Sequence, residues 1–206
     1  KSCSKKQIFI KEPTCYSCGK PMKNHEKEYC SDCRQHPKNF ERGMGLCIYQ
    51  KPVTNSLAAI KYKNERKFAK YYLEEIQKRK YRDLLQLKID VIIPVPIHRK
   101  KRRKRGFNQA EEFGKRLSHY LEIPMNSSLL IRSKKTVPQK DLGPALRLKN
   151  LEQAFSCRKL PYRMKKVLLI DDIYTTGSTA EACSRALKKA GAEQVFLLVI
   201  ATSSNR

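Results

Sequence analysis

Residues 167–179 combine two acidic side chains with a turn rich in hydroxyl groups. The apolar run Val167–Ile170 predicts a buried strand, and Asp171 and Asp172 follow it directly. The turn that comes next supplies four hydroxyls and a glycine: Thr175, Thr176, Gly177, Ser178 and Thr179. Such a turn before a helix binds a phosphate group through its backbone N–H groups and the helix dipole. The two carboxylates would suit sugar hydroxyls and a divalent cation, and a role confined to capping the strand-to-helix loop does not account for this turn.

Two C-x-x-C pairs near the amino end have the spacing of a structural metal site. They are Cys15 with Cys18 and Cys30 with Cys33. Four thiolates complete the tetrahedral shell that structural zinc prefers. A redox C-x-x-C pair is the alternative, but such a pair accompanies a βαβ pattern that this region lacks. We therefore predict that the four cysteines bind one zinc ion.

The sequence is strongly basic, and seven consecutive basic residues occupy positions 99–105. The formal charge is +26, from 45 Lys and Arg against 19 Asp and Glu. A positive field of this size attracts polyanions such as nucleic acids. A lysine-rich surface can also serve solubility alone, so charge by itself does not identify a partner.

Short apolar segments alternate with amphipathic ones over residues 45–201. We expect strands at residues 45–50, 90–97, 127–132, 166–170 and 195–201, and helices within residues 53–81, 107–121 and 179–189. This alternation predicts an α/β fold with a mainly parallel sheet and helices on both faces. Such a sheet would present Asp171 and Asp172 at its carboxyl edge, where open α/β sheets bind ligands. The basic run 99–105 and the polar residues 134–149 are expected to be loops.

Composition limits the class of protein. Hydrophobic residues make up 40% of the chain, which supports a folded core rather than a disordered chain. No apolar run approaches the roughly 20 residues that a membrane helix requires. Half of the eight cysteines belong to the two C-x-x-C pairs, and no secretion signal is evident, which argues against a disulfide scaffold. We expect a cytoplasmic protein with no membrane span.

The segment 167–179 resembles the motif with which type I phosphoribosyltransferases bind 5-phosphoribosyl 1-pyrophosphate (PRPP). The resemblance implies that Asp171 and Asp172 hold the ribose hydroxyls together with magnesium. It implies that the 5′-phosphate lies on the turn residues Thr175, Thr176, Gly177, Ser178 and Thr179. In these enzymes the loop after a strand such as 90–97 binds pyrophosphate, which here assigns that role to Arg99, Lys100 and Lys101.

A further set of residues is similar to the ComF family of late-competence proteins. The family's R-x-R-G-F-N-Q core is matched by Arg103, Arg105, Gly106, Phe107, Asn108 and Gln109. Its T-x-x-Q-x-x-L, R-x-x-N and A-F elements are matched by Thr136, Gln139, Leu142, Arg147, Asn150, Ala154 and Phe155. The resemblance covers nearly the whole chain and implies a zinc ribbon at residues 1–40 and a phosphoribosyltransferase-like domain at residues 41–206. The sequence departs from the family at Arg99, Arg102 and Lys104, where a proline, an apolar residue and an acid are common.

Three functions follow from these resemblances. The first is a PRPP-binding protein that assists uptake or handling of single-stranded DNA in natural transformation, with a late-competence helicase as a further partner. The alternative is an active phosphoribosyltransferase that joins PRPP to a nucleobase or amine, although no base-recognition motif follows Val199. The third is a zinc-ribbon nucleic-acid binder with a vestigial transferase fold, against which the intact acidic pair and turn argue.

Overall fold

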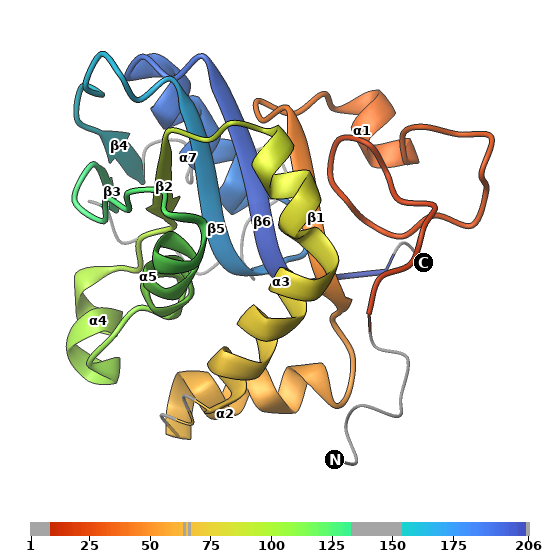
Figure 1. Ribbon diagram of the computed structural model, residues 1–206, viewed down its shortest axis with the longest axis horizontal. Coiled ribbons are helices and arrows are strands. Elements are labelled where there is room, and N and C mark those ends of the chain that lie inside the picture. Colours follow the sequence, from red (N-terminus) through yellow and green to blue (C-terminus); the bar gives the residue numbers. More distant parts are fainter. Residues whose placement is uncertain (1–8, 64, 66, 133–153, 205–206) are drawn as a thin grey trace.

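A sheet of four parallel strands forms the centre of the molecule (Figure 1). This computed structural model describes residues 9–63, 65, 67–132 and 154–204. Across the sheet the strands follow the order β1 (Arg42–Ile48), β6 (Gln194–Thr202), β5 (Lys166–Tyr174) and β2 (Val91–Pro94). Each neighbouring pair is parallel.

Helices cover both faces of this sheet. One face carries α2 (Val53–Lys63), α3 (Lys67–Gln86) and α5 (Gln109–Leu121). The opposite face carries α7 (Ser178–Lys189). Successive side chains of a strand point to opposite faces, so β6 sends Leu197 to the α7 side and Leu198 to the α3 side, and both are fully buried. The α/β fold with a parallel sheet and helices on both faces is confirmed.

Two short strands add an antiparallel pair beside α7. They are β3 (Leu130–Arg132) and β4 (Phe155–Cys157), which pair with each other. The sequence predicted β3 within residues 127–132 but not β4, whose three residues are too few to carry a recognisable period. The other predicted strands and helices are confirmed, with ends that differ by a few residues.

The basic run forms helix α4 (Arg99–Arg105), so the expectation of a loop there is wrong. Arg and Lys are good helix formers. The side chain of His98 accepts a hydrogen bond from the backbone N–H of Lys100, and Gly106, with φ 81°, ends the helix in the left-handed conformation. The residues predicted as a loop at 134–149, and the family elements from Thr136 to Asn150, lie outside the described residues.

The amino-terminal segment lies directly against β1. It includes the short helix α1 (Ser31–Gln35). The backbone N–H of Ile10 donates to the carbonyl of Leu46 at 3.0 Å. A Cβ on Gly43 would collide with the backbone of Cys18, so this glycine permits the close approach. The division into a ribbon at 1–40 and a domain at 41–206 stays a prediction. Within the described ranges, no helix is both long and apolar enough to cross a membrane.

Candidate functional site

Strand β5 carries its two aspartates past the end of the neighbouring strand. β2 ends at Pro94, opposite Ile170, whereas β6 continues beside β5 as far as Tyr174. Strand β5 is therefore longer than the predicted strand 166–170, because it includes both aspartates. Because alternate residues face opposite sides, Asp171 lies on the α7 side and Asp172 on the α2 side. The two side chains leave the strand on different sides, yet the charges of Asp172 and Lys61 still act on the carboxyl group of Asp171. Both aspartates lie next to an edge that β2 no longer covers.

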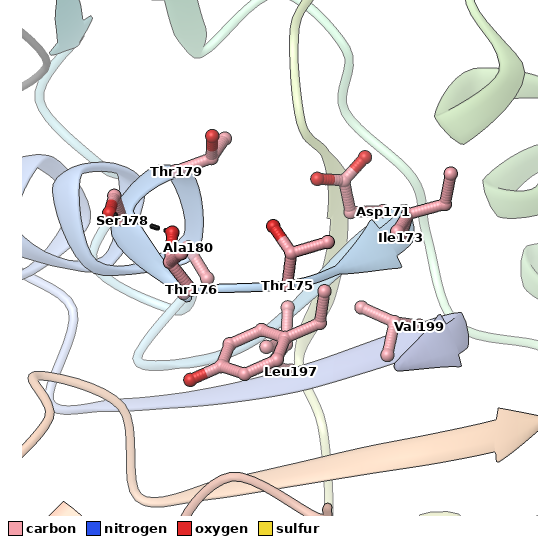
Figure 2. Close-up of a pocket in the computed structure, with 11 residues that line it drawn as sticks. Asp171, Ile173, Thr175, Thr176, Ser178, Thr179, Ala180, Leu197 and Val199 are labelled. Atoms are coloured by element: carbon pink, nitrogen blue, oxygen red, sulfur yellow. Dashed lines mark hydrogen bonds between the residues drawn. The ribbon is translucent and has the colours of Figure 1, made fainter. Parts of the chain in front are cut away.

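Asp171 shares a pocket with the hydroxyl-rich turn. All five residues predicted to bind phosphate, Thr175–Thr179, line this pocket, and Leu197 and Val199 of β6 complete its wall (Figure 2). Thr175 and Thr176 are exposed, while Ser178 and Thr179 are half-buried. The structure thus brings Asp171 and the turn together. Asp172 is not part of the pocket.

Gly177 and Tyr174 shape the turn. Gly177 has φ 80° and immediately precedes α7, whose first N–H groups have no intrahelical acceptor and can bind an anion. The ring of Tyr174 lies so close that a Cβ on Gly177 would overlap the tyrosine hydroxyl. That hydroxyl is buried, and no hydrogen-bond partner for it exists within the described ranges. The turn therefore depends on a glycine at this position.

The carboxyl group of Asp171 is poorly accommodated without a cation. Burial raises the pKa of Asp171 to about 8, and the negative charge of Asp172 adds to the increase. A cation beside the carboxylate would reverse this shift, because it stabilises the charged form. Carboxylate and hydroxyl oxygens are ligands that Mg²⁺ accepts, together with phosphate oxygens of a substrate. The residues present thus fit a magnesium ion that arrives with a phosphorylated ligand.

Asp172 is paired with a residue that the sequence analysis missed. The Nζ atom of Lys61, near the end of α2, forms an ion pair with the carboxylate of Asp172, and both side chains are largely buried. Lys61 is one of many lysines within residues 53–81. Nothing in its spacing distinguishes it, so only the folded chain identifies it.

Helix α4 lies on the same side of the sheet as Lys61. None of its seven residues is buried. Arg99, Lys100 and Lys101 do not line the pocket of Asp171. Lys101 instead lines a second hollow together with Lys61. Arg102 is engaged within the protein, because its guanidinium pairs with Glu111 of α5 at 2.5 Å.

Asn108 of the R-G-F-N-Q motif connects the end of β2 to the start of α5. Its side-chain amide donates to the carbonyl of Val95 at 2.9 Å. Its Oδ1 atom accepts a hydrogen bond from the backbone N–H of Ala110 at 3.2 Å and so caps α5. Together with the left-handed Gly106, this residue fixes the orientation of α4 relative to the sheet.

The other motif residues hold the base of α4. Arg105 donates to the side-chain oxygen of Gln109 at 2.6 Å. Phe107 is partly buried against the core on the α3 side. Arg103 is exposed. The motif, predicted from resemblance alone, therefore includes residues that build the junction between β2, α4 and α5.

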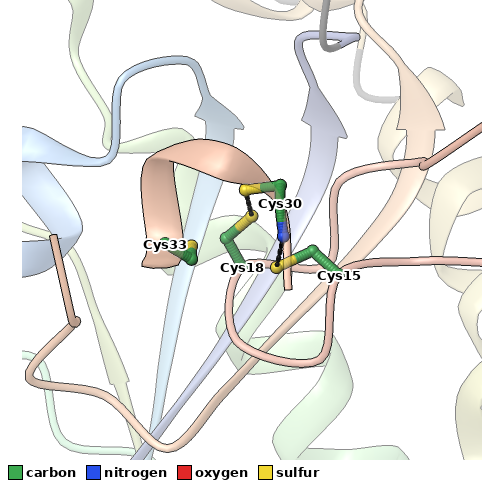
Figure 3. A group of neighbouring side chains, drawn as sticks. All are labelled: Cys15, Cys18, Cys30 and Cys33. Carbon is green, nitrogen blue, oxygen red and sulfur yellow. Dashed lines mark hydrogen bonds between the residues drawn. The ribbon is translucent and has the colours of Figure 1, made fainter. Parts of the chain in front are cut away.

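The four predicted zinc ligands form one buried cluster (Figure 3). The Sγ atoms of Cys15, Cys18, Cys30 and Cys33 all lie within 4.8 Å of one another. Those of Cys18 and Cys30 are 3.8 Å apart, which matches the ~3.8 Å edge of a tetrahedron with zinc–sulfur bonds of about 2.3 Å. The pKa of Cys33 is raised to about 12, mainly by its hydrogen bond with Cys15 and further by burial. Without a cation this cluster disfavours full ionisation, so its geometry and its chemistry both suit a bound metal.

The cysteine cluster belongs to the same packed core as Tyr174, which lies directly before the hydroxyl-rich turn. The core on the α7 side contains the four cysteines, Phe40 and Tyr174. The rings of Phe40 and Tyr174 meet edge to face, with centroids 6.3 Å apart. The backbone N–H of Asn39, just after the cluster, donates to Glu181 in the first turn of α7 at 2.9 Å. The amino-terminal segment therefore contacts Tyr174 and the first turn of α7, the two elements on either side of the turn.

Comparison with known proteins agrees with this arrangement. A model of the phosphoribosyl transferase domain family matches residues 73–206, which include both aspartates and the turn. Competence protein F of Haemophilus influenzae is 31% identical, and the match covers 94% of this chain and 86% of that protein. DNA utilization protein YhgH of Escherichia coli K12 is 30% identical, with 88% and 80% covered. Competence protein ComFC of Bacillus subtilis is 25% identical, with 92% and 78% covered.

Proposed function

Since the chain belongs to the phosphoribosyl transferase domain family and, within it, to the ComF family of competence proteins, we propose that it binds PRPP with magnesium and handles single-stranded DNA in natural transformation. The observation that carries the PRPP assignment is the pocket that unites Asp171 with the turn Thr175–Thr179. The names of the relatives, competence protein F and DNA utilization protein, support the DNA assignment.

PRPP fits this edge of the sheet with its 5′-phosphate on the turn. Backbone N–H groups before α7 and the hydroxyls of Thr175–Thr179 bind the phosphate oxygens. The carboxylate of Asp171 accepts a hydrogen bond from a ribose hydroxyl on the same side. Asp172 approaches the sugar around the open edge of β5 beyond Pro94, and its ion pair with Lys61 must loosen as it does so.

Magnesium, when bound, neutralises the charges of the pyrophosphate group of PRPP and of the acidic pair. Asp171 is the residue in the pocket that would hold it. Binding in this form requires Asp171 to release its proton, because the unliganded carboxyl group has a raised pKa. Arg99 and Lys100 at the start of α4 supply cations for the pyrophosphate from the neighbouring strand end, whereas Lys101 lines the hollow beside Lys61.

Single-stranded DNA is assigned to the basic side of the molecule. The seven basic residues of α4 are outside the core, and the net charge favours a polyanion. A late-competence helicase is proposed as a protein partner by family resemblance. The four-cysteine cluster is proposed to bind one structural zinc, which maintains the amino-terminal segment that supports the turn.

An active phosphoribosyltransferase is the second candidate function. The match to the transferase domain family and the intact pocket favour it. In that reaction a nucleobase or amine displaces pyrophosphate from C1 of PRPP, and cationic groups stabilise the leaving pyrophosphate. Release of pyrophosphate in the presence of candidate acceptors, and none without them, distinguishes this function from binding alone.

Two binding experiments test the proposal. Purified protein is titrated with PRPP in the presence of magnesium and, separately, with a fluorescent single-stranded oligonucleotide at several salt concentrations. We expect saturable binding of both ligands, with DNA affinity that falls as salt increases. Failure to bind PRPP would reject the pocket assignment, and failure to bind the oligonucleotide at low salt would reject the DNA assignment.

A further inference from the structure

A hollow between α2 and α4 combines cations with aromatic rings. It is lined by Lys61, Tyr62, Lys101, Lys104, Arg105 and Phe107. Its volume is about 370 Å³, which lies in the lower part of the range for small-ligand sites. It adjoins the Lys61–Asp172 ion pair and therefore lies on the opposite side of β5 from the pocket of Asp171.

Tyr62 presents its ring to solvent within this hollow. The residue is 77% exposed, although a large aromatic side chain gains free energy by burial. The guanidinium of Arg105 lies 5.5 Å from the centre of the ring. Arg105 is itself held by Gln109 at 2.6 Å. An exposed ring beside a fixed cation is suited to an aromatic ligand that carries negative charge.

Two of the cations that line the hollow are available to such a ligand. Lys101 and Lys104 are exposed, and neither forms an ion pair with any residue that the structure describes. Arg102, by contrast, is engaged by Glu111. Lys101 and Lys104 of α4 thus line the hollow together with Tyr62, and no acidic residue that the structure describes neutralises them.

We propose that this hollow binds one nucleotide of a single-stranded nucleic acid, with the base stacked on Tyr62 and the adjoining phosphates on Lys101 and Lys104. The proposal rests on the DNA-handling function above and names the surface that performs it. Aromatic stacking combined with a basic groove is the usual way to hold single strands without reading their sequence. A duplex cannot offer an unpaired base to Tyr62, so the hollow favours single strands.

The test measures the affinity of the full chain for a short oligo-dT strand and for an abasic strand of equal length. Tyr62→Ala should weaken oligo-dT binding about 5- to 150-fold, the effect of one base stacked on an aromatic ring. Tyr62→Phe should bind like the wild type, because the ring remains. On the abasic strand the wild type and Tyr62→Ala should bind equally, since no base is present to stack.

Tyr162→Ala is the matched control. Tyr162 is 87% exposed and has Lys165 5.8 Å from its ring centre, but it precedes the amino end of β5. Its replacement should leave oligo-dT affinity unchanged. Free dTMP and duplex DNA are measured as well. If dTMP binds as tightly as oligo-dT and this binding depends on Tyr62, the ligand of the hollow is a free nucleotide rather than a strand.

The results also separate this inference from the function on which it rests. Equal oligo-dT affinity in the wild type and in Tyr62→Ala would overturn the hollow as the binding site while leaving DNA handling intact. Wild-type protein that binds no oligonucleotide would overturn both. Unchanged PRPP affinity in Tyr62→Ala would show that the variant is folded.

Discussion

The two faces of strand β5 carry different kinds of binding surface. On the α7 side, Asp171 shares a pocket with the turn Thr175–Thr179, supported by the buried ring of Tyr174 and by the cysteine cluster. On the α2 side, Asp172 is paired with Lys61, and beyond it lie the exposed side chains of α4 and Tyr62. One strand thus separates a preformed pocket from an exposed surface rich in cations.

The difference indicates what each side can recognise. A turn fixed by a left-handed glycine and a helix end has one geometry, which suits a single phosphorylated ligand. Exposed Lys and Arg side chains adapt to many backbone geometries, which suits a polymer bound without sequence preference. Substitutions in the turn should therefore affect PRPP and spare DNA, and substitutions at Tyr62 or Lys104 should do the reverse.

Loss of the cysteine cluster should have the largest effect. Cys30→Ser should lose the metal and cost more than about 4 kcal/mol of unfolding free energy, as changes that remove a metal site do. PRPP affinity should fall as well, because the segment after the cluster contacts α7 through Asn39. Metal analysis, thermal unfolding and calorimetry measure the three effects. Cys157→Ser, outside the cluster, should retain one zinc per chain, and full zinc retention by a Cys30/Cys33 double variant would contradict the site.

Gly177→Ala should damage the pocket side alone. The left-handed backbone is strained for alanine by about 1–3 kcal/mol, and the new Cβ would overlap the hydroxyl of Tyr174. PRPP affinity should fall tenfold or more, with DNA affinity unchanged. Gly191→Ala is the control, because Gly191 has φ 109° with no atom near its absent Cβ. It should lose stability without losing PRPP affinity, and equal PRPP affinity in the two variants would reject the role given to the turn.

Lys104→Gln should have the smallest effect, confined to the basic side. Losing one phosphate contact lowers the slope of log affinity against log salt by roughly 0.7 for a single strand. PRPP affinity should not change. Lys189→Gln, an exposed residue of α7 on the other face, should leave the salt slope as it is. Arg102→Gln is a poorer probe, because it also breaks the ion pair with Glu111. A salt slope unaffected by Lys104→Gln would remove α4 from the DNA surface.

Much of the pocket side could be predicted from the sequence, because its signals are local. An apolar strand, two acids and a hydroxyl-rich turn lie within thirteen consecutive residues, 167–179, and the cysteine pairs have a fixed spacing. The structure brings together Asp171 and the turn, and separately the four cysteines. The sequence could not show that Asp172 faces the other side, because that depends on how far β5 extends beside β6.

The α2 side could not be predicted, because it depends on contacts between distant segments. Lys61 and Tyr62 come from one helix, and Lys101, Lys104 and Arg105 from another. The basic run was also misread as a loop, since seven cations suggest solvent exposure but not the caps at His98 and Gly106 that make a helix. Local patterns identify a site built on one turn, whereas a site built between two helices requires the fold.

The stability of an Asp171→Asn variant separates binding from folding. The raised pKa of Asp171 means that the folded protein holds a proton that the unfolded chain releases at lower pH. This carboxyl group therefore costs stability progressively as the pH rises from about 4 to about 8, and the cost stays constant at higher pH. Asparagine cannot ionise, so the variant should be at least as stable as the wild type at pH 8.5. Any loss of ligand affinity would then report the site itself.

Calorimetry of PRPP binding with magnesium, for wild type and Asp171→Asn at pH 6 and pH 8.5, tests the central claim most directly. Wild-type affinity should increase from pH 6 to pH 8.5, because at pH 6 a proton must leave Asp171 when the ligand binds. The variant should lose about 1.5–3 kcal/mol or more of binding free energy, the contribution of a hydrogen bond to a charged group, and should lose this pH dependence. Equal affinity in wild type and variant at both pH values would contradict the assignment of the pocket to PRPP.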